Sequence, residues 1–597
     1  MQTKIALLFS YLFLFLVGVF YYPKWEKGET EATLSWDVSG YYFYLPAFLI
    51  YEDAKQLQFA PEILEKYSPT PDLQQAYRHE NGNMVMKYSS GQAIIFSPFF
   101  AVAHLVAQQH PNYPPDGFSF PYQLSIGLGS LLICFIGLFF LAKILRHYFE
   151  DRIAALTLLI LVLTSNYLEY GAISSAMTHN SLFTIYTLLI WTTIQFYKKP
   201  DFKKAILIGV CVGLAALTRP TEIIACLIPI LWGIPSISSR LKFFQEHWAK
   251  LLSATIVTLA IGSIQLMYWK YVTGDFIVYS YEEQGFSWLR PHLKDGFFST
   301  RAGWLTYTPI MTFALLGFYF LYRKSKALFW STFVFSILFI YITFAWDIWW
   351  YGGSLGQRAM VQAYPVLAIP LAAFLAWIWR QKVWKHAFLA VSALFLYYNF
   401  WLIHQAHLGG LLRPGEMTKP YFWGIVGRFD VAEEKQKLLD TNELFQGERK
   451  DVQLLFEENF STQFVDTLQL NGDYAISPPY GMQIDNAHPF SPFFEIEKQT
   501  IPKTAKWLRA SAHFVVPYKE YNTWMMTQFT VKFMNGEEAV KTKKIRLHRF
   551  LENEKWRELW IDTKIPDEAF SKVRVYFWNT ESPKQLFVDD LKIESFR

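Results

Sequence analysis

Long apolar blocks separated by short polar segments fill the chain as far as Ile403. Each block has about the length that a helix needs to cross a bilayer, roughly 20 residues, although two are shorter. This pattern predicts a multi-pass α-helical membrane domain of about 11 spans. The predicted spans are Ile5–Tyr22, Phe120–Ala142, Ile153–Tyr170, Ser181–Tyr197, Ala205–Leu217, Ile223–Ile234, Leu251–Tyr271, Trp304–Tyr322, Leu328–Ala345, Ala359–Trp379 and Ala387–Ile403.

The composition agrees with a membrane protein, because 52% of the residues are hydrophobic and only 18% are charged. The first apolar block also has the length of a secretory signal peptide. No small-residue cleavage site follows this block, so we expect it to remain as a membrane anchor.

Basic residues cluster in alternate short loops between the predicted spans. The positive-inside rule makes these loops cytoplasmic, together with the N-terminus. The remaining loops and everything after Ile403 then lie outside. These residues set the orientation, so the net charge of +5 needs no nucleic acid to explain it. The clusters are Lys143/Arg146/Arg152, Lys198/Lys199/Lys203/Lys204, Arg240/Lys242/Lys250, Arg323/Lys324/Lys326 and Arg380/Lys382/Lys385.

The first external loop, residues 23–119, has hydrophobic patterning of its own. Gly40–Tyr51 has the pattern of an aromatic amphipathic helix. Gly91–Ala107 is nearly long enough to span, but a crossing there would turn every later basic loop outward. We therefore expect this segment to lie along the membrane interface, kinked at Pro98.

After Ile403 the pattern changes to period two, which is typical of β-strands. Phe529-Thr-Val531-Lys-Phe533 is one example, and turn signals such as Asn471-Gly472 separate the strands. Many short strands at this spacing predict an all-β jelly-roll sandwich. We divide the chain into a membrane domain (1–403), a linker (404–450) and an exported sandwich (451–597).

Cysteine placement bears on the cellular compartment. All three cysteines, Cys134, Cys211 and Cys226, lie in predicted spans, so the exported tail has no disulfides. This favours a bacterial inner (cell) membrane protein with a cytoplasmic N-terminus and a periplasmic or extracellular tail.

Asp37 stands out because it follows the first span and is surrounded by aromatic residues. Two interpretations are open for this carboxylate. It is either the N-cap of a helix that starts near Ser39 or a catalytic group at the membrane surface.

Other charged residues at the outer ends of spans have equally open roles. Lys87, next to Tyr88, either snorkels to lipid headgroups or binds a substrate. Arg219 pairs with Glu222 or with a phosphate. His179 is a helix-end hydrogen-bonding residue or a ligand-binding one.

Two further outer loops carry charge together with aromatic belts. The segment Trp346–Arg358 combines tryptophans with a Gly-rich bend and Arg358, and the loop 273–303 contributes Glu282 and Arg301. An aromatic belt alone does not require these charges on one side. The sequence has no Walker-type loop, no HExxH and no GxSxG, so nucleotide-driven transport and zinc hydrolysis lack support.

Over Met1–Ile403 the sequence resembles the GT-C superfamily of integral-membrane glycosyltransferases, in particular its protein O-mannosyltransferase and aminoarabinose transferase branch. The order of the motifs carries the resemblance. The motifs are Asp37 with Tyr41, Lys87-Tyr88, His179, Gly213–Pro220 (GLAALTRP) with Arg219, and Trp349–Arg358 (WWYGGSLGQR) with Arg358. Many relatives have an Asp-Glu pair where this chain reads Asp37-Val38. We therefore name no certain cofactor, and a divalent metal is the only candidate.

The resemblance implies transfer of a sugar from a polyprenyl-phosphate donor to a glycan, lipid or protein acceptor outside the membrane. Asp37 would be the base in a single inverting displacement. The residues expected to bind substrate are Tyr41, Lys87, Tyr88, His179, Arg219, Glu282, Arg301 and Arg358. Of these, the arginines and Lys87 would stabilise the departing phosphate.

The tail resembles carbohydrate-binding modules. Trp524, Trp556 and Trp560 are candidates for stacking on sugars, although packing in the core explains each about as well. Asp589-Asp590 is a candidate calcium ligand pair.

The alternative functions are a lipid-linked glycan flippase and a membrane-anchored glycan-binding protein without catalysis. A flippase needs cations deep in a cavity, whereas this chain places them at outer helix ends. An anchor does not need so many spans. Among enzymes, a lipid-linked glycan polymerase or ligase remains open.

Overall fold

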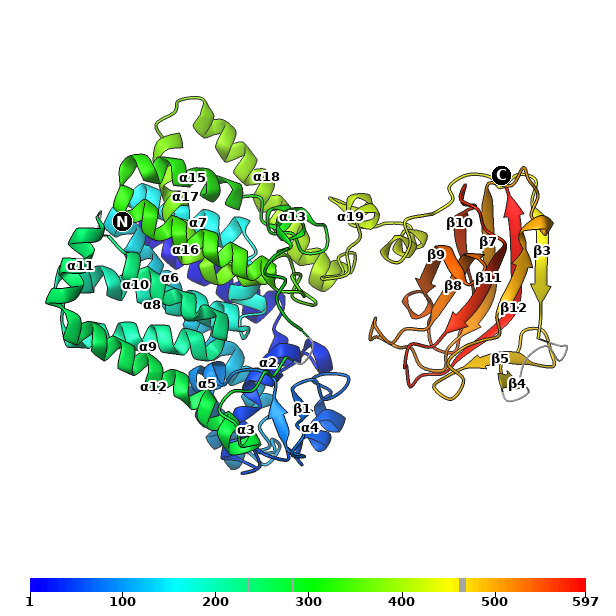
Figure 1. Ribbon diagram of the computed structural model, residues 1–597, viewed down its shortest axis with the longest axis horizontal. Coiled ribbons are helices and arrows are strands. Elements are labelled where there is room, and N and C mark those ends of the chain that lie inside the picture. The colour runs from blue at the N-terminus through cyan, green and yellow to red at the C-terminus, as the bar shows by residue number, and fades with distance from the viewer. Residues whose placement is uncertain (234–235, 282–283, 461–468) are drawn as a thin grey trace. The chain divides into compact units, whose positions relative to one another are not determined.

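A computed structural model describes residues 1–233, 236–281, 284–460 and 469–597. The chain forms two compact units, Met1–Glu416 and Met417–Arg597. The first unit is helical and the second contains two β-sheets (Figure 1). The predicted fold class, a multi-pass helical membrane protein with a C-terminal all-β sandwich, is confirmed.

Seven helices in the described part of the chain are long and apolar enough to cross a membrane. This number is smaller than the predicted eleven. The other predicted spans fall on helices that are too short or too polar to qualify. The qualifying segments are Gln2–Glu26, Gly91–Gln109, Phe120–Tyr148, Trp248–Thr273, Lys326–Ala345, Arg358–Ile378 and Trp384–Gly409.

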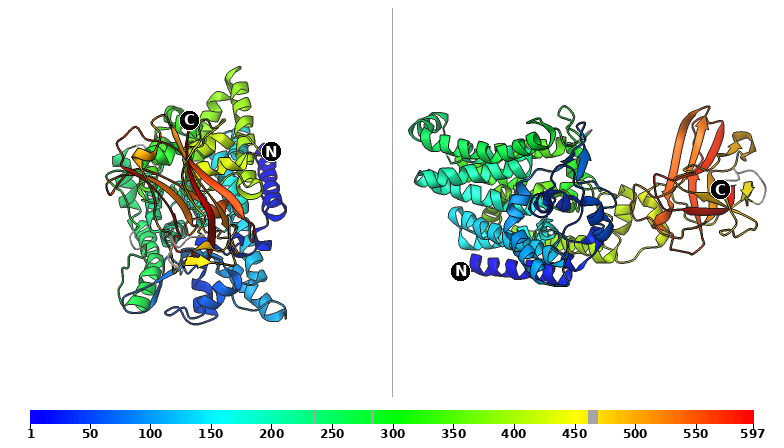
Figure 2. Two further views of the ribbon diagram at one scale, coloured as in Figure 1. Left: turned by 90° about the vertical axis from the view of Figure 1, so that its right-hand side faces the viewer. Right: turned by 90° about the horizontal axis from the view of Figure 1, so that it is seen from below.

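The helices of the first unit pack around α17 (Tyr364–Ile378), whose segment is 94% buried. Helix α15 (Met311–Lys324) packs against α17, α6 (Phe120–Tyr148) against α8 (Thr178–Lys198), and α9 (Phe202–Thr218) against α12 (Trp248–Thr273). The α12 segment is only 11% buried, so its apolar surface is available to lipid. Figure 2 shows the helical first unit from two further sides.

Small residues permit these close helix contacts, as is common in membrane bundles. A Cβ on Gly209 of α9 would lie 2.4 Å from the Ala254 carbonyl of α12. A Cβ on Gly317 of α15 would lie 2.0 Å from the Pro370 carbonyl of α17. At both positions a side chain would force the helices apart.

The remaining elements of the first unit follow in chain order. They are α1 (Gln2–Leu16), α4 (Ala60–Tyr67), α7 (Asp151–Thr164), α10 (Leu227–Leu231), α11 (Ile237–Glu246), α13 (Leu293–Phe298), α14 (Trp304–Tyr307), α16 (Lys326–Ala345) and α18 (Trp384–His404). Short π or 3-10 segments lie between several of the helices, including η4 (Glu169–Ile173), η5 (Pro220–Cys226) and η6 (Arg358–Ala363).

The first external loop is a folded layer. The segment predicted as one amphipathic helix is two short helices, α2 (Trp36–Tyr42) and α3 (Tyr44–Leu49), which are largely buried. A hairpin follows, β1 (Ala76–Arg78) with β2 (Met84–Met86). Helix α5 (Gly91–Gln109), predicted at the interface, contains Pro98 and meets the length and hydropathy of a span.

The second unit is a sandwich of two antiparallel sheets. One sheet has the order β10-β7-β12-β5-β4 with β3 also paired to β12, and the other has the order β6-β11-β8-β9. The strands are β3 (Gln453–Glu458), β4 (Leu470–Asn471), β5 (Gly481–Ile484), β6 (Phe494–Glu497), β7 (Trp507–Val515), β8 (Gln528–Asn535), β9 (Glu538–Arg546), β10 (Arg557–Lys564), β11 (Lys572–Trp578) and β12 (Leu586–Phe596).

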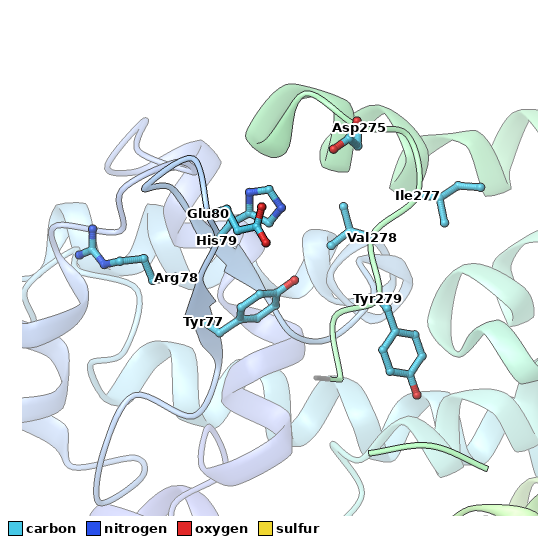
Figure 3. A pocket seen from close by; sticks show the side chains of 8 residues that line it. All are labelled: Tyr77, Arg78, His79, Glu80, Asp275, Ile277, Val278 and Tyr279. Atoms are coloured by element: carbon cyan, nitrogen blue, oxygen red, sulfur yellow. The ribbon is translucent and has the colours of Figure 1, made fainter. Parts of the chain in front are cut away.

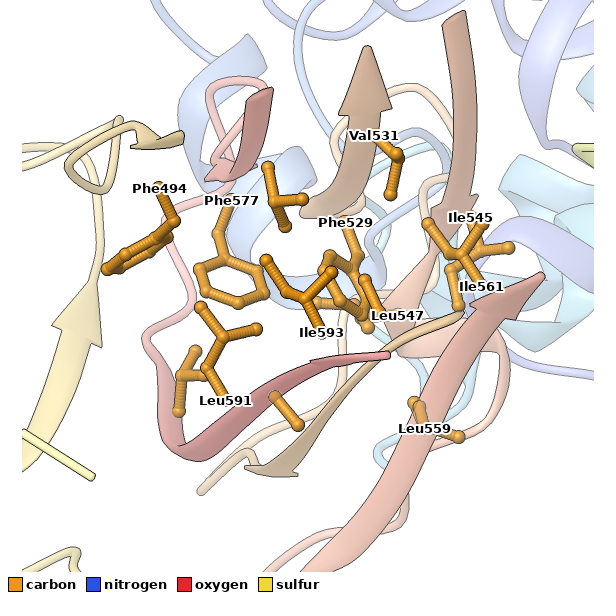
Figure 4. Packing of buried hydrophobic residues seen from close by; sticks show 14 of the residues in the cluster. Phe494, Phe529, Val531, Ile545, Leu547, Leu559, Ile561, Phe577, Leu591 and Ile593 are labelled. Carbon is orange, nitrogen blue, oxygen red and sulfur yellow. The ribbon is translucent and has the colours of Figure 1, made fainter. Parts of the chain in front are cut away.

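Alternate residues of both sheets point into one apolar core, as the period-two pattern requires. Phe529, Phe577, Ile561 and Ile593 are fully or almost fully buried there (Figure 4). This core stabilises the unit without disulfides.

Residues 417–450, within the segment predicted as a linker, group with the sheets. They contain α19 (Lys419–Ile425) and the 3-10 segment η8 (Glu433–Leu439). Just after η8, the buried Asp440 carboxylate accepts hydrogen bonds from Arg546 and Arg549. This ion pair attaches the segment to the end of β9.

The candidate sugar-stacking tryptophans differ in exposure. Trp524 is 67% exposed. The ring of Trp560 is covered by Lys437, whose Nζ is 3.3 Å from the ring centroid, and by Arg509. Trp560 is therefore occupied by protein contacts.

Candidate active site

Asp37 lies in the first turn of α2, so it is not the N-cap that one of the two interpretations required. Ser35 is the residue in the N-cap position, and the helix starts at Trp36. Trp36 has a φ of +49°, an uncommon and strained value for a bulky residue. The strained backbone therefore immediately precedes the Asp37 carboxylate.

Two groups hold the Asp37 carboxylate. Arg358 Nη2 donates to Oδ2 at 2.5 Å, and the Tyr88 hydroxyl donates to Oδ1 at 2.7 Å. Burial by itself would raise the pKa of Asp37. The charge of Arg358 and the two hydrogen bonds outweigh burial and lower the pKa below its ordinary value. The carboxylate is therefore ionised at neutral pH.

The position of Tyr88 depends on a glycine in α2. A Cβ on Gly40 would lie 2.3 Å from Cδ2 of the Tyr88 ring, so only glycine leaves room for the ring. Tyr41 packs beside this ring with 4.5 Å between centroids. Tyr44 donates a hydrogen bond to the Tyr88 carbonyl at 2.6 Å. One short helix thus supplies the carboxylate and positions its partner.

Arg358 begins η6 at the end of the Gly-rich bend. Tyr351, Gly352 and Gly356 all have positive φ, which turns the chain back toward the helices. A Cβ on Gly356 would lie 2.6 Å from Tyr307, so this turn needs glycine for space as well as for conformation. The Tyr170 hydroxyl of η4 lies 3.2 Å from Ser354 Oγ and steadies the bend.

Arg219 and His179 lie beside this bend. The Arg219 guanidinium is 5.4 Å from the Tyr351 ring centroid, and its Nη1 is 3.4 Å from His179 Nδ1. The charge of Arg219 also acts on Asp37. The start of α5 packs closely against the end of α9, just before Arg219, because a Cβ on Gly91 would lie 2.4 Å from the backbone nitrogen of Thr218.

The other predicted site residues are placed as follows. Lys87 Nζ lies 5.7 Å from the Tyr281 ring centroid, and that ring packs edge-on against Tyr88. Arg301 stacks at 3.6 Å on Trp350 and donates to the Gly415 carbonyl, and no contact joins it to Asp37 in the part of the chain that the structure describes. Glu282 lies outside the described residues.

The structure adds residues that the sequence pattern did not single out as site residues. Glu222 is buried and accepts hydrogen bonds from Tyr186 and Gln362. Gln362 also contacts His179, and the signal that could have revealed it is its place about one turn after Arg358 in the 3-10 segment η6. Tyr281 gave no such signal, because its role depends on a fold contact.

A cavity of about 350 Å³ lies between the β1–β2 hairpin and the chain after α12 (Figure 3). Its lining contains none of the predicted site residues. The two chain segments that form its walls meet next to the cavity, because Ser280, which follows the lining residue Tyr279, donates from Oγ to the Lys87 carbonyl at 2.7 Å. The lining residues are Tyr77, Arg78, His79, Glu80, Asp275, Ile277, Val278 and Tyr279.

The described residues contain no group of three His, Cys, Asp or Glu side chains able to hold a metal ion. Asp37 has an arginine and a tyrosine as partners rather than a second carboxylate. Asp589 accepts from the backbone nitrogens of Ile476 and Ser477, and Asp590 accepts from Ser477 Oγ. These side chains fit a metal poorly, so we derive no step through one.

Residues 118–268 match the family of dolichyl-phosphate-mannose-protein mannosyltransferases. A search of curated proteins finds no match. The family match agrees with the resemblance to GT-C glycosyltransferases over residues 118–268, and the protein is a multi-pass membrane protein.

Solved structures are similar over large parts of the chain at low identity. One is the oligosaccharyltransferase AglB from Archaeoglobus fulgidus, solved with an inhibitory peptide and a dolichol-phosphate (10% identity, 70% of this chain and 56% of that chain, TM-score 0.43). Another is the arabinosyltransferase EmbB from Mycobacterium smegmatis (10% identity, 84% and 64%, TM-score 0.27). The chain thus covers less than two thirds of either enzyme's length.

The sandwich also has a similar solved structure. It is the CBM22-1 xylan-binding domain of Xyn10C from Paenibacillus barcinonensis (14% identity, 25% of this chain and 97% of that chain, TM-score 0.18).

Proposed function

We propose that this protein is an inverting glycosyltransferase that moves a sugar from a polyprenyl-phosphate donor to an acceptor at the outer face of a bacterial inner membrane. The observation that carries the proposal is the contact of Asp37 with Arg358 beside Arg219. It brings an acid and two guanidinium groups from distant segments together at one place.

Arg358 is suited to bind the donor phosphate. Its Nη2 donates to Asp37, whereas its Nε is buried and has no hydrogen-bond partner among the described residues. A buried guanidinium N–H without an acceptor is costly, and a phosphate oxygen would satisfy it. Arg219 supplies a second positive charge for the same anion.

Asp37 is the proposed base. When a phosphate oxygen accepts a hydrogen bond from the Arg358 guanidinium, the hydrogen bond from Arg358 to Asp37 weakens. The Asp37 carboxylate can then accept the proton of the acceptor hydroxyl. The acceptor oxygen bonds to the anomeric carbon as the bond to the phosphate oxygen breaks, and the lipid phosphate leaves with those electrons. The arginines stabilise the charge that develops on it.

The remaining predicted residues have supporting roles in this proposal. Tyr88 orients the carboxylate, Tyr41 packs against Tyr88, and Lys87 lies at the edge of the site near Tyr281. Arg301 would contact a bound substrate only at its periphery. The sandwich would hold the acceptor glycan.

The test uses the full-length protein in lipid nanodiscs with a panel of radiolabelled undecaprenyl-phosphate sugars. The wild type is expected to release undecaprenyl phosphate from one donor. Asp37→Asn is expected to lower release by at least about a thousandfold, while it still binds bare undecaprenyl phosphate.

Asp72→Asn is the matched control, because Asp72 is an exposed carboxylate of the same external loop. It is expected to retain wild-type activity. Full activity of Asp37→Asn would refute the proposed base. Movement of intact donor across the membrane without sugar release would instead indicate a flippase.

A further inference from the structure

One face of the sheet β6-β11-β8-β9 points away from the sandwich core and is rich in lysine and arginine. Strand register places Arg574 opposite both Glu495 and Lys532, and Lys532 opposite Thr542. The next row crosses from Tyr576 through Thr530 to Lys544. Their neighbours Val531, Val575 and Ile545 lie in the core, so these side chains are on the opposite face.

The charge on this face is not balanced. Glu495 pairs with Arg574 and Lys572. Neither Lys532 nor Lys544 has a carboxylate within 4 Å among the described residues. The two lysines are diagonal neighbours on adjacent strands, where like charges repel. A bound anion would remove this repulsion.

Aromatic rings border the two lysines. Phe490 and Phe493 are 47% and 52% exposed, and they pack against Trp578 and Tyr576 respectively. The Arg574 guanidinium lies 4.5 Å from the Phe493 ring centroid, so it covers part of this ring and leaves the rest exposed. Lys532 Nζ lies 5.3 Å from the Tyr576 ring centroid. Exposed rings beside hydrogen-bonding groups are the surfaces on which sugar rings stack.

A buried polar atom lies in the same row. Thr530 is 2% exposed, and its hydroxyl has no hydrogen-bond partner among the described residues. An unsatisfied hydroxyl is unfavourable and is available to a ligand that reaches between the lysines.

We propose that this face binds an anionic glycan, with the negative group held by Lys532 and Lys544 and a sugar ring packed on Phe493. The tryptophans that the sequence suggested for sugar binding are not part of this face. The inference does not depend on the transferase activity.

The test measures binding of the full-length protein in nanodiscs to polygalacturonate, with neutral xylan as the uncharged comparison. Lys532→Gln/Lys544→Gln is expected to weaken polygalacturonate binding about tenfold, and added salt is expected to weaken wild-type binding. Phe493→Ser is expected to weaken binding at any salt concentration.

The matched control is Lys503→Gln/Lys555→Gln, which removes two exposed lysines of the same unit. It is expected to leave binding unchanged. Equal loss in both double variants would indicate nonspecific charge attraction and overturn the proposal. Undiminished binding in Lys532→Gln/Lys544→Gln would overturn it as well.

A second inference comes from a chain of hydrogen bonds beside Arg219. Tyr186 donates to one oxygen of the Glu222 carboxylate at 2.6 Å, and Gln362 Nε2 donates to the other at 2.5 Å. Because the amide nitrogen of Gln362 faces Glu222, its oxygen faces His179. That oxygen is 2.9 Å from His179 Nδ1.

This chain fixes the tautomer of His179. An amide oxygen only accepts, so Nδ1 must carry the proton. The Arg219 guanidinium is also only a donor, so its 3.4 Å approach to Nδ1 is a packing contact rather than a hydrogen bond. A neutral ring, favoured beside this cation, then has its lone pair on Nε2, which has no partner among the described residues.

We infer that His179 Nε2 accepts a hydrogen bond from a hydroxyl of the sugar being transferred, and that Glu222 and Gln362 are positioning residues. This rests on the proposed function, in which Arg219 binds the phosphate next to that sugar. A lone pair cannot bond to a phosphate oxygen, which has no proton, but it can accept from a sugar hydroxyl.

Two substitutions separate this role from a structural one. Asn at position 179 retains a donor near Nδ1 but removes Nε2, whereas Gln places an amide near Nε2. His179→Asn is expected to raise KM for the undecaprenyl-phosphate sugar that the wild type uses about tenfold, and His179→Gln is expected to restore part of the loss.

Binding of bare undecaprenyl phosphate distinguishes the two proposals. His179→Asn is expected to leave it unchanged, because the phosphate contacts are intact. A KM in His179→Asn equal to that of the wild type would overturn the proposed role of Nε2. It would not contradict the proposed transferase function. Absence of transfer by the wild type on every donor would refute the transferase itself.

Discussion

Asp37 Oδ2 and Arg358 Nη2 lie 2.5 Å apart although 321 positions separate the two residues in the chain. Asp37 comes from the layer outside the first helix, and Arg358 comes from the bend before α17. Both side chains are partly buried, with 26% of Asp37 and 17% of Arg358 accessible. A pair at this depth is strongly coupled, and removal of either partner leaves the other charge without compensation.

The first prediction concerns stability. Asp37→Asn and Arg358→Gln are each expected to destabilise the protein by about 2–4 kcal/mol, because each leaves a partly buried charge unpaired. The double variant is expected to lose about 1–3 kcal/mol less than the sum of the two single variants. Thermal unfolding of all four proteins in one detergent measures this. Additive losses would contradict a direct pair.

The second prediction concerns pH. Because Arg358 and Tyr88 lower the pKa of Asp37, the carboxylate stays ionised until the pH falls below its ordinary titration range. Transfer is therefore expected to show no loss attributable to Asp37 between pH 5 and pH 7. The pH profile of kcat/KM checks this.

Arg358→Gln removes the main cause of the lowered pKa and supplies the control for the pH profile. As the pH is lowered, the residual kcat/KM of this variant is expected to begin to fall at a higher pH than that of the wild type. An acid limb that does not move in this variant would show that Arg358 does not control the protonation of the base.

The third prediction uses the contact of Gly40 with Tyr88. Gly40→Ala places a methyl 2.3 Å from the Tyr88 ring, so the ring must move and its hydrogen bond to Asp37 is lost. We expect transfer to fall about tenfold to a hundredfold. Gly28→Ala is the control, because a Cβ there meets nothing within 4 Å. Equal activity of the two variants would show that the Tyr88 position is unimportant.

The fourth prediction concerns Lys437 in the C-terminal unit. Lys437 is 3% exposed, and its ammonium has no hydrogen-bond partner among the described residues. Burial lowers its pKa to about 7 from about 10.5 in the unfolded chain. Unfolding therefore takes up a proton between these values, so stability rises with pH by up to about 1.4 kcal/mol per unit from pH 7 to pH 10.5.

Lys437→Met keeps the packing on Trp560 without the charge. It is expected to raise the unfolding temperature of this unit at pH 7 and to flatten its dependence on pH. Lys435→Met, on the same 3-10 segment, is the control and is expected to retain the wild-type slope. Thermal unfolding from pH 6.5 to pH 9 compares the three proteins, and an unchanged slope in Lys437→Met would contradict the assignment.

Local pattern was enough to predict the class of the fold. Apolar runs define helices such as α6 and α16, because a helix in lipid must satisfy its own backbone and present apolar side chains over its whole length. The alternation around Phe529 and Phe533 defines strands for the same local reason. Length and apolarity alone select fewer helices than the eleven predicted spans, because α7 and α9 are short and α8, which is buried inside the bundle, contains more polar residues than a lipid-facing helix.

The contacts within the candidate site could be predicted from the sequence only in part. The sequence alone singled out Asp37, Arg219 and Arg358, since charge at the outer ends of apolar segments is costly and conspicuous. It did not determine that Asp37 lies inside the first turn of α2, that Arg301 lies apart from it, or that Gln362 connects Glu222 to His179. Those relationships depend on packing between segments that are far apart in the chain. A contact such as that of Gly40 with Tyr88 is decided by the space available in the folded protein, and no periodic pattern in the sequence reports it.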